Sequence, residues 1–199
     1  MKYTALIVTF NRLGKLKKTV EETLKLEFTN IVIVNNGSTD GTQAWLSSIV
    51  DTRVIVLTLT ENTGGAGGFK TGSQYICEQL ASDWVFFYDD DAYPYPDTLK
   101  SFSQLDKRGC RVFSGLVKDP QGKPCPMNMP FSRVPTSLGD TVRYLRYPGE
   151  FIPAANRSMF VQTVSFVGMV IHRDLLATSL DYIREQLFIY FDDLYFGYQ

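Results

Sequence analysis

Three consecutive aspartates, Asp89, Asp90 and Asp91, are the most chemically informative group in the chain. They directly follow the apolar run Trp84 to Tyr88, so they are predicted to lie where a buried strand ends. Like charges in a partly desolvated place repel one another unless a cation or strong donors compensate them. Side chains alternate along a strand, which would put Asp89 and Asp91 on one side and Asp90 on the other. Because carboxylate oxygens suit Mg²⁺ or Mn²⁺, Asp89 and Asp91 are predicted metal ligands; the alternative is a solvated acidic turn.

A glycine-rich segment, Asn62 to Phe69, precedes a helical pattern and follows an apolar run. Glycine lets backbone amides approach a phosphate or sugar closely, and a helix N-terminus favours negative charge. The segment matches neither the P-loop pattern nor a clean dinucleotide-binding pattern, so neither of those functions is indicated. By itself it fits a flexible entry to a helix equally well.

The elements that must position these groups alternate short apolar runs with amphipathic stretches, which is typical of parallel strands covered by crossover helices. Strands are predicted at Tyr3 to Thr9, Ile31 to Val34, Val54 to Leu59 and Trp84 to Tyr88, and helices at Leu13 to Leu24, Thr42 to Ile49 and Ala66 to Ala81. In an open parallel sheet, ligands bind beyond the carboxyl ends of the strands, near the place where the strand order reverses. Polar groups follow three of these strands, and we therefore expect them to converge on one edge of the sheet. They are Asn11, Asn35 with Asn36, and Asp89 to Asp91.

Beyond Pro94 the pattern is weaker. The sequence predicts a helix over Asp97 to Lys107, a strand over Val112 to Val117 and a hairpin tip over Asp119 to Pro126. Residues 126–157 are rich in proline, glycine and aromatic side chains without a clear period, which predicts a long ordered loop or a segment that covers the substrate. Strand-like runs return at Phe160 to Ile171 and at Leu187 to Phe191, and the second ends in Asp192 and Asp193.

Length and composition favour one globular domain, since 44% of the 199 residues are hydrophobic. Twenty basic and 21 acidic residues leave a net charge of −1, so nucleic acid is not an expected partner. Cys77, Cys110 and Cys125 are odd in number and widely spaced, which argues against a disulfide framework or a structural zinc site and favours the cytoplasm. No stretch has the length of a signal peptide or a membrane span, and peripheral contact with the inner membrane face stays open as an alternative.

The order of the motifs resembles that of the family 2 inverting glycosyltransferases, and among them the bacterial galactofuranosyl and rhamnosyl transferases. The motifs are Thr9 to Arg12, Val34 to Thr42, Asn62 to Gly68, Asp89 to Asp91 and Phe191 to Asp193. The resemblance implies a GT-A fold, which is a Rossmann-like, mostly parallel central sheet flanked by helices, with a smaller antiparallel or loop-rich acceptor part. It also implies a single domain with a nucleotide-sugar-binding half at residues 1–95 and an acceptor-side half at residues 96–199. Relatives generally continue past the last motif, so the chain is expected to be truncated at its C-terminus.

The resemblance further implies roles for individual residues. Residues expected to bind a UDP- or dTDP-sugar donor are Thr9, Phe10, Asn11, Arg12, Asn35, Asn36, Asp40, Asn62, Gly65, Ala66, Gly68 and Asp90. Asn36 stands where the family often has an acidic residue that reads the base or ribose, and an amide there keeps hydrogen bonding available. Mg²⁺ or Mn²⁺ on Asp89 and Asp91 would stabilise the leaving nucleoside diphosphate. Asp193, with Asp192 as the alternative, matches the base that deprotonates a saccharide or lipid-linked saccharide acceptor.

The expected activity is inverting, metal-dependent transfer of a sugar, galactofuranose or rhamnose, to a cell-envelope or capsular polysaccharide or glycolipid. Two alternatives stay open. A sugar nucleotidyltransferase also needs a nucleotide, a metal and aspartates, but it usually carries a basic glycine-rich segment near the N-terminus, and Thr9 to Lys15 contains none. A non-catalytic fragment would bind the nucleotide sugar without hydrolysis or transfer.

Overall fold

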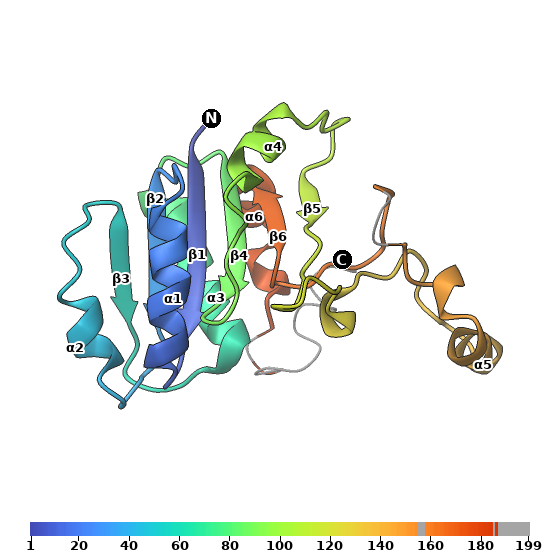
Figure 1. Cartoon of the computed structure of the whole chain (residues 1–199), viewed down its shortest axis with the longest axis horizontal. Helices are drawn as coiled ribbons and strands as arrows, with labels where there is room; N and C mark the ends of the chain where they lie inside the picture. The colour runs from blue at the N-terminus through green and yellow to red at the C-terminus, as the bar shows by residue number, and fades with distance from the viewer. Residues whose placement is uncertain (155–157, 185, 187–199) are drawn as a thin grey trace.

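A sheet of six strands forms the centre of the chain within residues 1–154, 158–184 and 186, which are the residues that this computed structural model describes (Figure 1). The strand order is β3-β2-β1-β4-β6-β5. Parallel neighbours are β1 (Tyr3–Thr9), β2 (Asn30–Asn35), β3 (Val54–Thr58) and β4 (Trp84–Asp89). At the other edge, β6 (Met169–His172) is antiparallel to both β4 and β5 (Val112–Ser114). The predicted α/β architecture with a mostly parallel sheet is confirmed.

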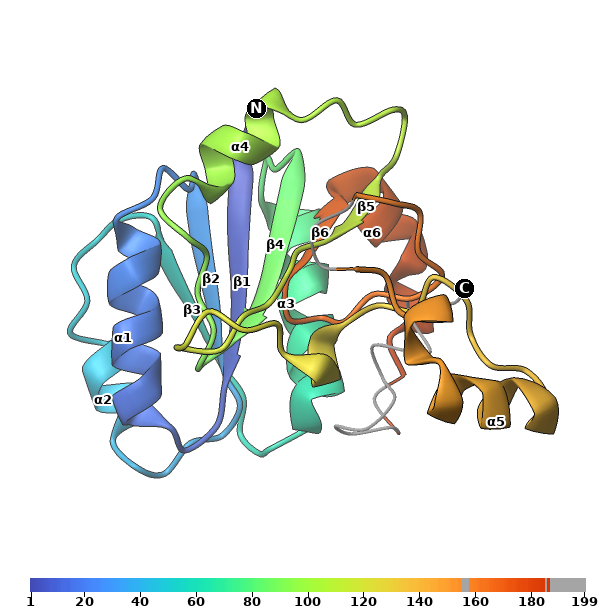
Figure 2. The same ribbon diagram turned by 45° about the vertical axis from the view of Figure 1, so that its right-hand side comes forward.

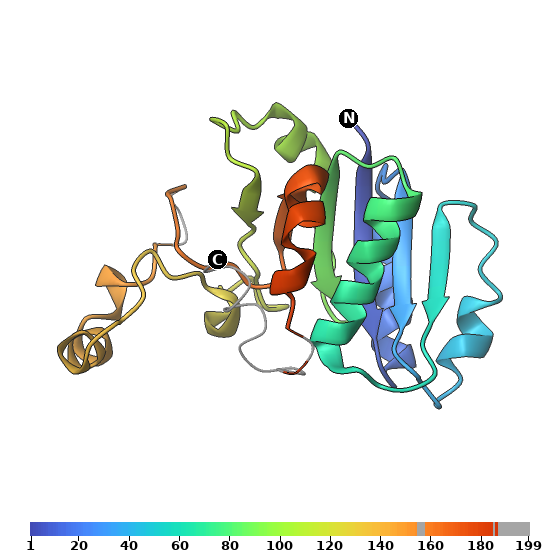
Figure 3. The same ribbon diagram turned by 180° about the vertical axis from the view of Figure 1, so that it is seen from behind.

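Helices cover both faces of the sheet (Figures 1 and 3). One face carries α1 (Leu13–Leu24), α2 (Thr42–Leu46) and α4 (Thr98–Gln104), and the other carries α3 (Gly64–Gln79) and α6 (Arg173–Ser179). Successive residues of β1 enter different cores: Ala5 and Ile7 face the α1 layer, whereas Leu6 and Val8 face the α3 layer. Strands buried on both faces explain why β1, β2 and β4 are almost continuously apolar in sequence.

Close packing of α3 on the sheet explains part of the glycine-rich segment. A Cβ atom added at Gly68 would lie 2.5 Å from Val8 Cγ1, and one added at Gly72 would lie closer still to Leu6. The helix begins at Gly64, whose φ of +75° is costly for other residues. The predicted helix is therefore confirmed, with a start two residues earlier than the sequence pattern placed it.

The strand order reverses between β1 and β4. From β1 the chain steps outward to β2 and β3, and then returns to place β4 on the opposite side of β1. The register pairs Thr9 with Asn35 and Val8 with Asp89, so the carboxyl ends of β2, β1 and β4 lie level at one edge. Such a reversal point is where α/β sheets bind ligands.

The second half follows the prediction less closely. The helix α4 and the strand β5 are present but shorter than expected, and an isolated bridge between Lys118 and Pro124 confirms the hairpin tip. The strand-like run from Phe160 forms a strand only as β6. Leu187 to Phe191, with Asp192 and Asp193, lie outside the described residues.

The prediction of a loop over residues 126–157 is wrong in part, because that region contains helix α5 (Leu138–Arg146) and two single 3₁₀ turns, Pro126–Asn128 and Pro148–Glu150. The Ser137 side chain caps α5 by accepting a hydrogen bond from the backbone N–H of Asp140 (3.0 Å). Figure 2 shows α5 standing away from the sheet. Within the described chain, no helix is long and apolar enough to cross a membrane.

Candidate functional site

Asp90 is a buried carboxyl group held against the end of β1. Strand β4 ends at Asp89, and Asp90 lies in the turn that follows. Its Oδ2 accepts a hydrogen bond from Thr9 Oγ1 (2.9 Å), and the backbone N–H of Phe10 donates to the same carboxyl group. Burial raises the pKa of Asp90, while the hydrogen bond from Thr9 and the nearby Arg12 oppose that rise. The turn is therefore fixed to β1 at the reversal point of the sheet.

Asp91 lies at the surface between two cations. Its Oδ2 is 2.9 Å from Lys15 Nζ and 3.0 Å from Arg12 Nη1, and the same Nη1 lies 3.5 Å from Asp90 Oδ1. Asp90 and Asp91 thus meet at one guanidinium group instead of pointing to opposite sides. The alternation expected from the sequence does not extend past Asp89, because the chain turns there.

Hydrogen bonds join the loop after β1 to the loop after β2. The backbone N–H of Asn11 donates to Ser38 Oγ (3.0 Å), and Asn11 Oδ1 accepts from the backbone N–H of Thr39 (2.7 Å). Asp40 Oδ2 accepts from the backbone N–H of Leu13 (3.0 Å). Hydrogen bonds from the Thr42 hydroxyl and from Leu13 lower the pKa of Asp40, so the carboxylate is ionised where the two loops meet.

Asn36 connects the second loop to the glycine-rich segment. Its Nδ2 donates to Asn62 Oδ1 (3.0 Å) and to the carbonyl oxygen of Gly64 (2.8 Å). Its Oδ1 accepts from the backbone N–H and the hydroxyl of Thr63, both at 3.0 Å. Both donors and both acceptor sites of this amide, which is only 2% exposed, are thus used inside the chain. A contact between Asn36 and the nucleoside stays a prediction. In the structure, Asn36 holds two segments of the chain together.

The residues predicted to bind the donor divide by exposure. Exposed side chains at the edge are Phe10, Asn11, Arg12 and Asp40, together with the predicted metal ligand Asp91. Partly exposed residues are Asn62, Gly65 and Asp89. Buried residues are Thr9, Asn35, Asn36, Ala66, Gly68 and Asp90. The first two groups can meet a ligand directly, whereas the buried residues hold the loops that carry them.

The chemistry of the predicted metal ligands fits Mg²⁺ or Mn²⁺. Asp91 offers carboxylate oxygens at the exposed edge, and Asp89 is partly exposed at the end of β4. Carboxylate oxygens are the ligands that hard divalent cations prefer. Among the described residues, no group of three His, Cys, Asp or Glu side chains is placed to hold a metal. Mg²⁺ often binds through one or two carboxylates together with water and substrate phosphates, so a two-carboxylate edge suits an ion that binds with a diphosphate.

Sequence reasoning missed three residues that shape this edge. One is Lys15, and the others are Thr19 and Thr23 on the buried face of α1. Thr19 Oγ1 donates to the carbonyl oxygen of Asp90 (2.8 Å), and Thr23 Oγ1 lies 2.9 Å from the hydroxyl of Tyr88. The sequence did contain a signal for Thr19 and Thr23. They lie four residues apart on an otherwise apolar helix face, and buried hydroxyl groups need hydrogen-bond partners.

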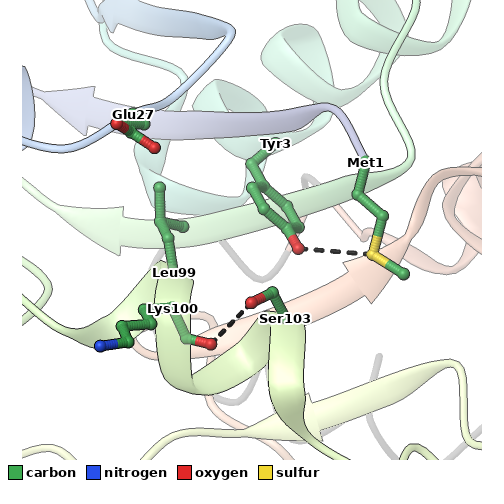
Figure 4. A pocket seen from close by; sticks show the side chains of 6 residues that line it. All are labelled: Met1, Tyr3, Glu27, Leu99, Lys100 and Ser103. Carbon is green, nitrogen blue, oxygen red and sulfur yellow. Dashed lines mark hydrogen bonds between the residues drawn. The ribbon is translucent and has the colours of Figure 1, made fainter.

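A separate hollow of about 610 Å³ lies at the opposite end of the sheet (Figure 4). It is lined by Met1, Tyr3, Glu27, Leu99, Lys100 and Ser103. The Tyr3 hydroxyl contacts Met1 Sδ (3.4 Å) across it. Since Tyr3 begins β1 and Thr9 ends it, this hollow is at the amino ends of the strands and away from the acidic turn.

The mostly parallel sheet flanked by helices is a GT-A fold, and solved structures share it. The structure of S. aureus TarS 1-349 has a TM-score of 0.68 and 20% identity, covering 100% of this chain and 55% of that chain. A longer TarS structure has a TM-score of 0.69 and 21% identity, and the match covers 100% of this chain and 33% of that chain. A third match is the mannosyltransferase PcManGT from Pyrobaculum calidifontis, in complex with GDP-Man and Mn²⁺. Its TM-score is 0.50 at 23% identity, and the match covers 60% of this chain and 36% of that chain. The chain thus spans about half of the shorter TarS chain and a third of the longer one.

The sequence itself identifies the family. The profile of glycosyl transferase family 2 matches residues 4–164, and the chain belongs to this family. A comparison with curated protein sequences gives no match. The predicted family and fold are confirmed, whereas closeness to galactofuranosyl and rhamnosyl transferases stays a prediction.

Proposed function

We propose that this chain is the donor-binding catalytic core of an inverting, metal-assisted glycosyltransferase that uses a UDP- or dTDP-sugar. The observation that carries the proposal is the meeting of two joined loops and an acidic turn at the carboxyl ends of β2, β1 and β4. Asn11 and Asp40 join the loops, and Thr9 holds Asp90 at their side. Family membership makes a sugar nucleotide the ligand to be expected at this edge.

The residues at the edge divide the chemical work. Arg12 and the exposed groups of the joined loops would bind the diphosphate and the nucleoside, while the buried Asp90 would hold the acidic turn beside them. Asp89 and Asp91 would hold Mg²⁺ or Mn²⁺, whose positive charge stabilises the leaving nucleoside diphosphate. Fixed groups of this kind lower the barrier because they need no reorganisation when charge develops.

The acceptor half of the proposal rests on residues 96–199. Asp193, with Asp192 as the alternative, would take the proton of the acceptor hydroxyl on the face opposite the diphosphate. Both lie outside the described residues. We propose galactofuranose or rhamnose as the sugar, and a cell-envelope or capsular saccharide, or its lipid-linked form, as the acceptor.

Peripheral contact with an anionic lipid surface belongs to the same proposal. Helix α5 exposes Leu138, Val142 and Leu145, which are 87%, 67% and 76% accessible and lie at helical spacing on one side. Arg143 and Arg146 lie in its last turn, where Arg143 pairs with Glu150 and the charge of Arg146 suits acidic headgroups. An exposed apolar helix face with flanking arginines is typical of interfacial helices, and a lipid-linked acceptor would be presented at such a surface.

The proposed reaction can be tested by incubating the chain with nucleotide sugars and candidate acceptors in Mn²⁺. Transfer or slow hydrolysis that releases a nucleoside diphosphate supports the proposal, and Asp91→Ala should reduce it at least about 100-fold, in line with losing metal-assisted charge stabilisation. Asp106→Ala is the matched control, because Asp106 is exposed and paired only locally with Arg108 (3.6 Å). Release of pyrophosphate from a nucleoside triphosphate and a sugar phosphate would instead identify a nucleotidyltransferase.

A further inference from the structure

Two cations share one oxygen of the carboxylate that the proposed metal needs. Asp91 Oδ2 lies 2.9 Å from Lys15 Nζ and 3.0 Å from Arg12 Nη1. The side chain of Asp91 is 39% exposed, and those of Arg12 and Lys15 are 52% and 58% exposed. Exposed ion pairs of this kind contribute little to stability, so the arrangement is easily exchanged for another.

A divalent ion and these two side chains compete for the same oxygen. Any cation bound to Asp91 would also lie within a few ångströms of the ammonium and guanidinium groups, and like charges at that distance repel. The repulsion falls if an anion arrives together with the ion. A diphosphate is such an anion, and both side chains are long enough and exposed enough to turn toward it.

We propose that Arg12 and Lys15 are exchange cations: they neutralise Asp91 when no donor is present and move to the diphosphate when it binds with its metal. This inference rests on the proposed function and adds Lys15 as a diphosphate-binding residue. It makes nucleotide and metal binding mutually dependent, because each ligand removes a charge conflict that the other creates. Lys15 lies close to Asp91 because it is in the first turn of α1, which starts at Leu13 beside the joined loops.

Lys15 gives the sharper test, because Arg12 also contacts Asp90 (3.5 Å). Removing the ammonium group should have opposite effects on the two ligands. Without nucleotide, Mn²⁺ should bind Lys15→Met about fivefold more tightly than the unchanged chain, since one competing charge is gone. With Mn²⁺ saturating, UDP should bind the variant about fivefold more weakly, since the diphosphate loses a cation. A purely structural role for Lys15 would shift both affinities in the same direction or neither.

Mn²⁺ binding can be measured by electron paramagnetic resonance of the free ion, and UDP binding by calorimetry, on the whole 199-residue chain. Lys25→Met is the matched control, because Lys25 caps the far end of α1 and pairs with Glu22 (2.8 Å); both affinities should stay unchanged. Lys15→Arg keeps the charge and should restore both values. Circular dichroism checks that each variant is folded.

The outcomes separate the inference from the proposed function. Mn²⁺ that binds the unchanged chain, with opposite shifts in Lys15→Met, supports both. Mn²⁺ that binds the unchanged chain while Lys15→Met shifts neither affinity, or shifts both in one direction, overturns the inference alone. Failure of the unchanged chain to bind Mn²⁺ with or without UDP overturns the metal site of the proposed function, and the exchange with it.

Discussion

At the scale of single residues, Asn36 shows what an amide at this position does that a carboxylate could not. Its two N–H groups donate to Asn62 Oδ1 and to the carbonyl oxygen of Gly64. A carboxylate has no proton to donate at neutral pH. The choice of asparagine therefore follows from the need to hold the start of α3 against the loop after β2.

Asn36→Asp should lower the free energy of unfolding by about 2–4 kcal/mol, because two buried acceptors lose their donors and a buried charge is added. Urea unfolding followed by circular dichroism measures this. Asn30→Asp is the control, since the amide of Asn30 makes only a long contact of 3.5 Å with Thr4 Oγ1. Equal stability of Asn36→Asp and the unchanged chain would show that the network around Asn36 contributes nothing.

The residue types of the site could be predicted from the sequence, but their contacts could not. Asp90 and Asp91 were recognisable as an acidic centre because they follow an apolar strand. Their meeting at Arg12 was not, because alternation holds only while the chain stays extended and β4 ends at Asp89. Lys15 was missed because nothing in a lysine-rich helix start distinguishes the one lysine that reaches an aspartate far along the chain.

At the scale of elements, α1 sets the position of the acidic turn. Thr19 and Thr23 point from its buried face to the end of β4, where they bond Asp90 and Tyr88. Burial raises the pKa of the Tyr88 phenol, so the group stays protonated and available for its hydrogen bond with Thr23. The helix thus fixes the height of the turn relative to β1.

Thr19→Val should cost about 1–2 kcal/mol of unfolding free energy, because the carbonyl oxygen of Asp90 loses a buried donor while the side-chain shape is kept. Affinity for the donor should fall in step, whereas Thr19→Ser should keep both. Thermal unfolding and calorimetry measure the two quantities. Thr178→Val, in which an exposed hydroxyl on α6 is removed, serves as control. A Thr19→Val chain with unchanged stability and unchanged donor affinity would refute this role.

The ion pair of Asp51 and Arg53 fixes the start of β3 to the end of α1, since Arg53 also donates to the carbonyl oxygens of Leu24 and Leu26. Hydrogen bonds from Arg53 lower the pKa of Asp51 to about 2. A lowered folded-state pKa gives stability that is present above the unfolded value of about 4 and is lost as the pH falls toward about 2.

Asp51→Asn should therefore be less stable than the unchanged chain at pH 7, with a difference that shrinks below about pH 4. Urea unfolding across this range tests the sign; a constant difference would contradict it.

Most elements of the first half were predictable because β1, β2 and β4 are buried on both faces and read as continuous apolar runs. The helix within residues 126–157 was not predictable in this way, because the apolar residues of α5 are exposed and do not pack into a core. Its cap at Ser137 and the spacing of Leu138, Val142 and Leu145 were the local signals of a helix.

At the scale of the whole molecule, the sheet carries the proposed donor edge while α5 stands apart from it (Figures 1 and 2). The ring of Tyr144 attaches α5 to Phe131 and Phe151, on the side away from its exposed apolar residues. In the proposed membrane contact, α5 would meet the lipid surface through the side opposite this attachment.

Replacing Leu138, Val142 and Leu145 together by serine should weaken binding to vesicles of anionic phosphatidylglycerol about tenfold or more, because three apolar side chains no longer enter the interface. Sedimentation with vesicles measures this, and the unfolding temperature should stay within a few degrees because these side chains are exposed. Val50→Ser, which removes another exposed apolar side chain in the loop after α2, is the control. Vesicle binding that is absent from the unchanged chain would remove the membrane contact from the proposal.

The central claim, a nucleotide-sugar site at the carboxyl ends of β2, β1 and β4, is tested most directly by calorimetry of UDP- and dTDP-sugars with and without Mn²⁺. We expect at least one of these donors to bind only when Mn²⁺ is present, and Asp91→Ala to abolish that binding while leaving the fold intact. Binding that is equally strong without Mn²⁺ and in Asp91→Ala, or no binding of any nucleotide sugar, would contradict the claim.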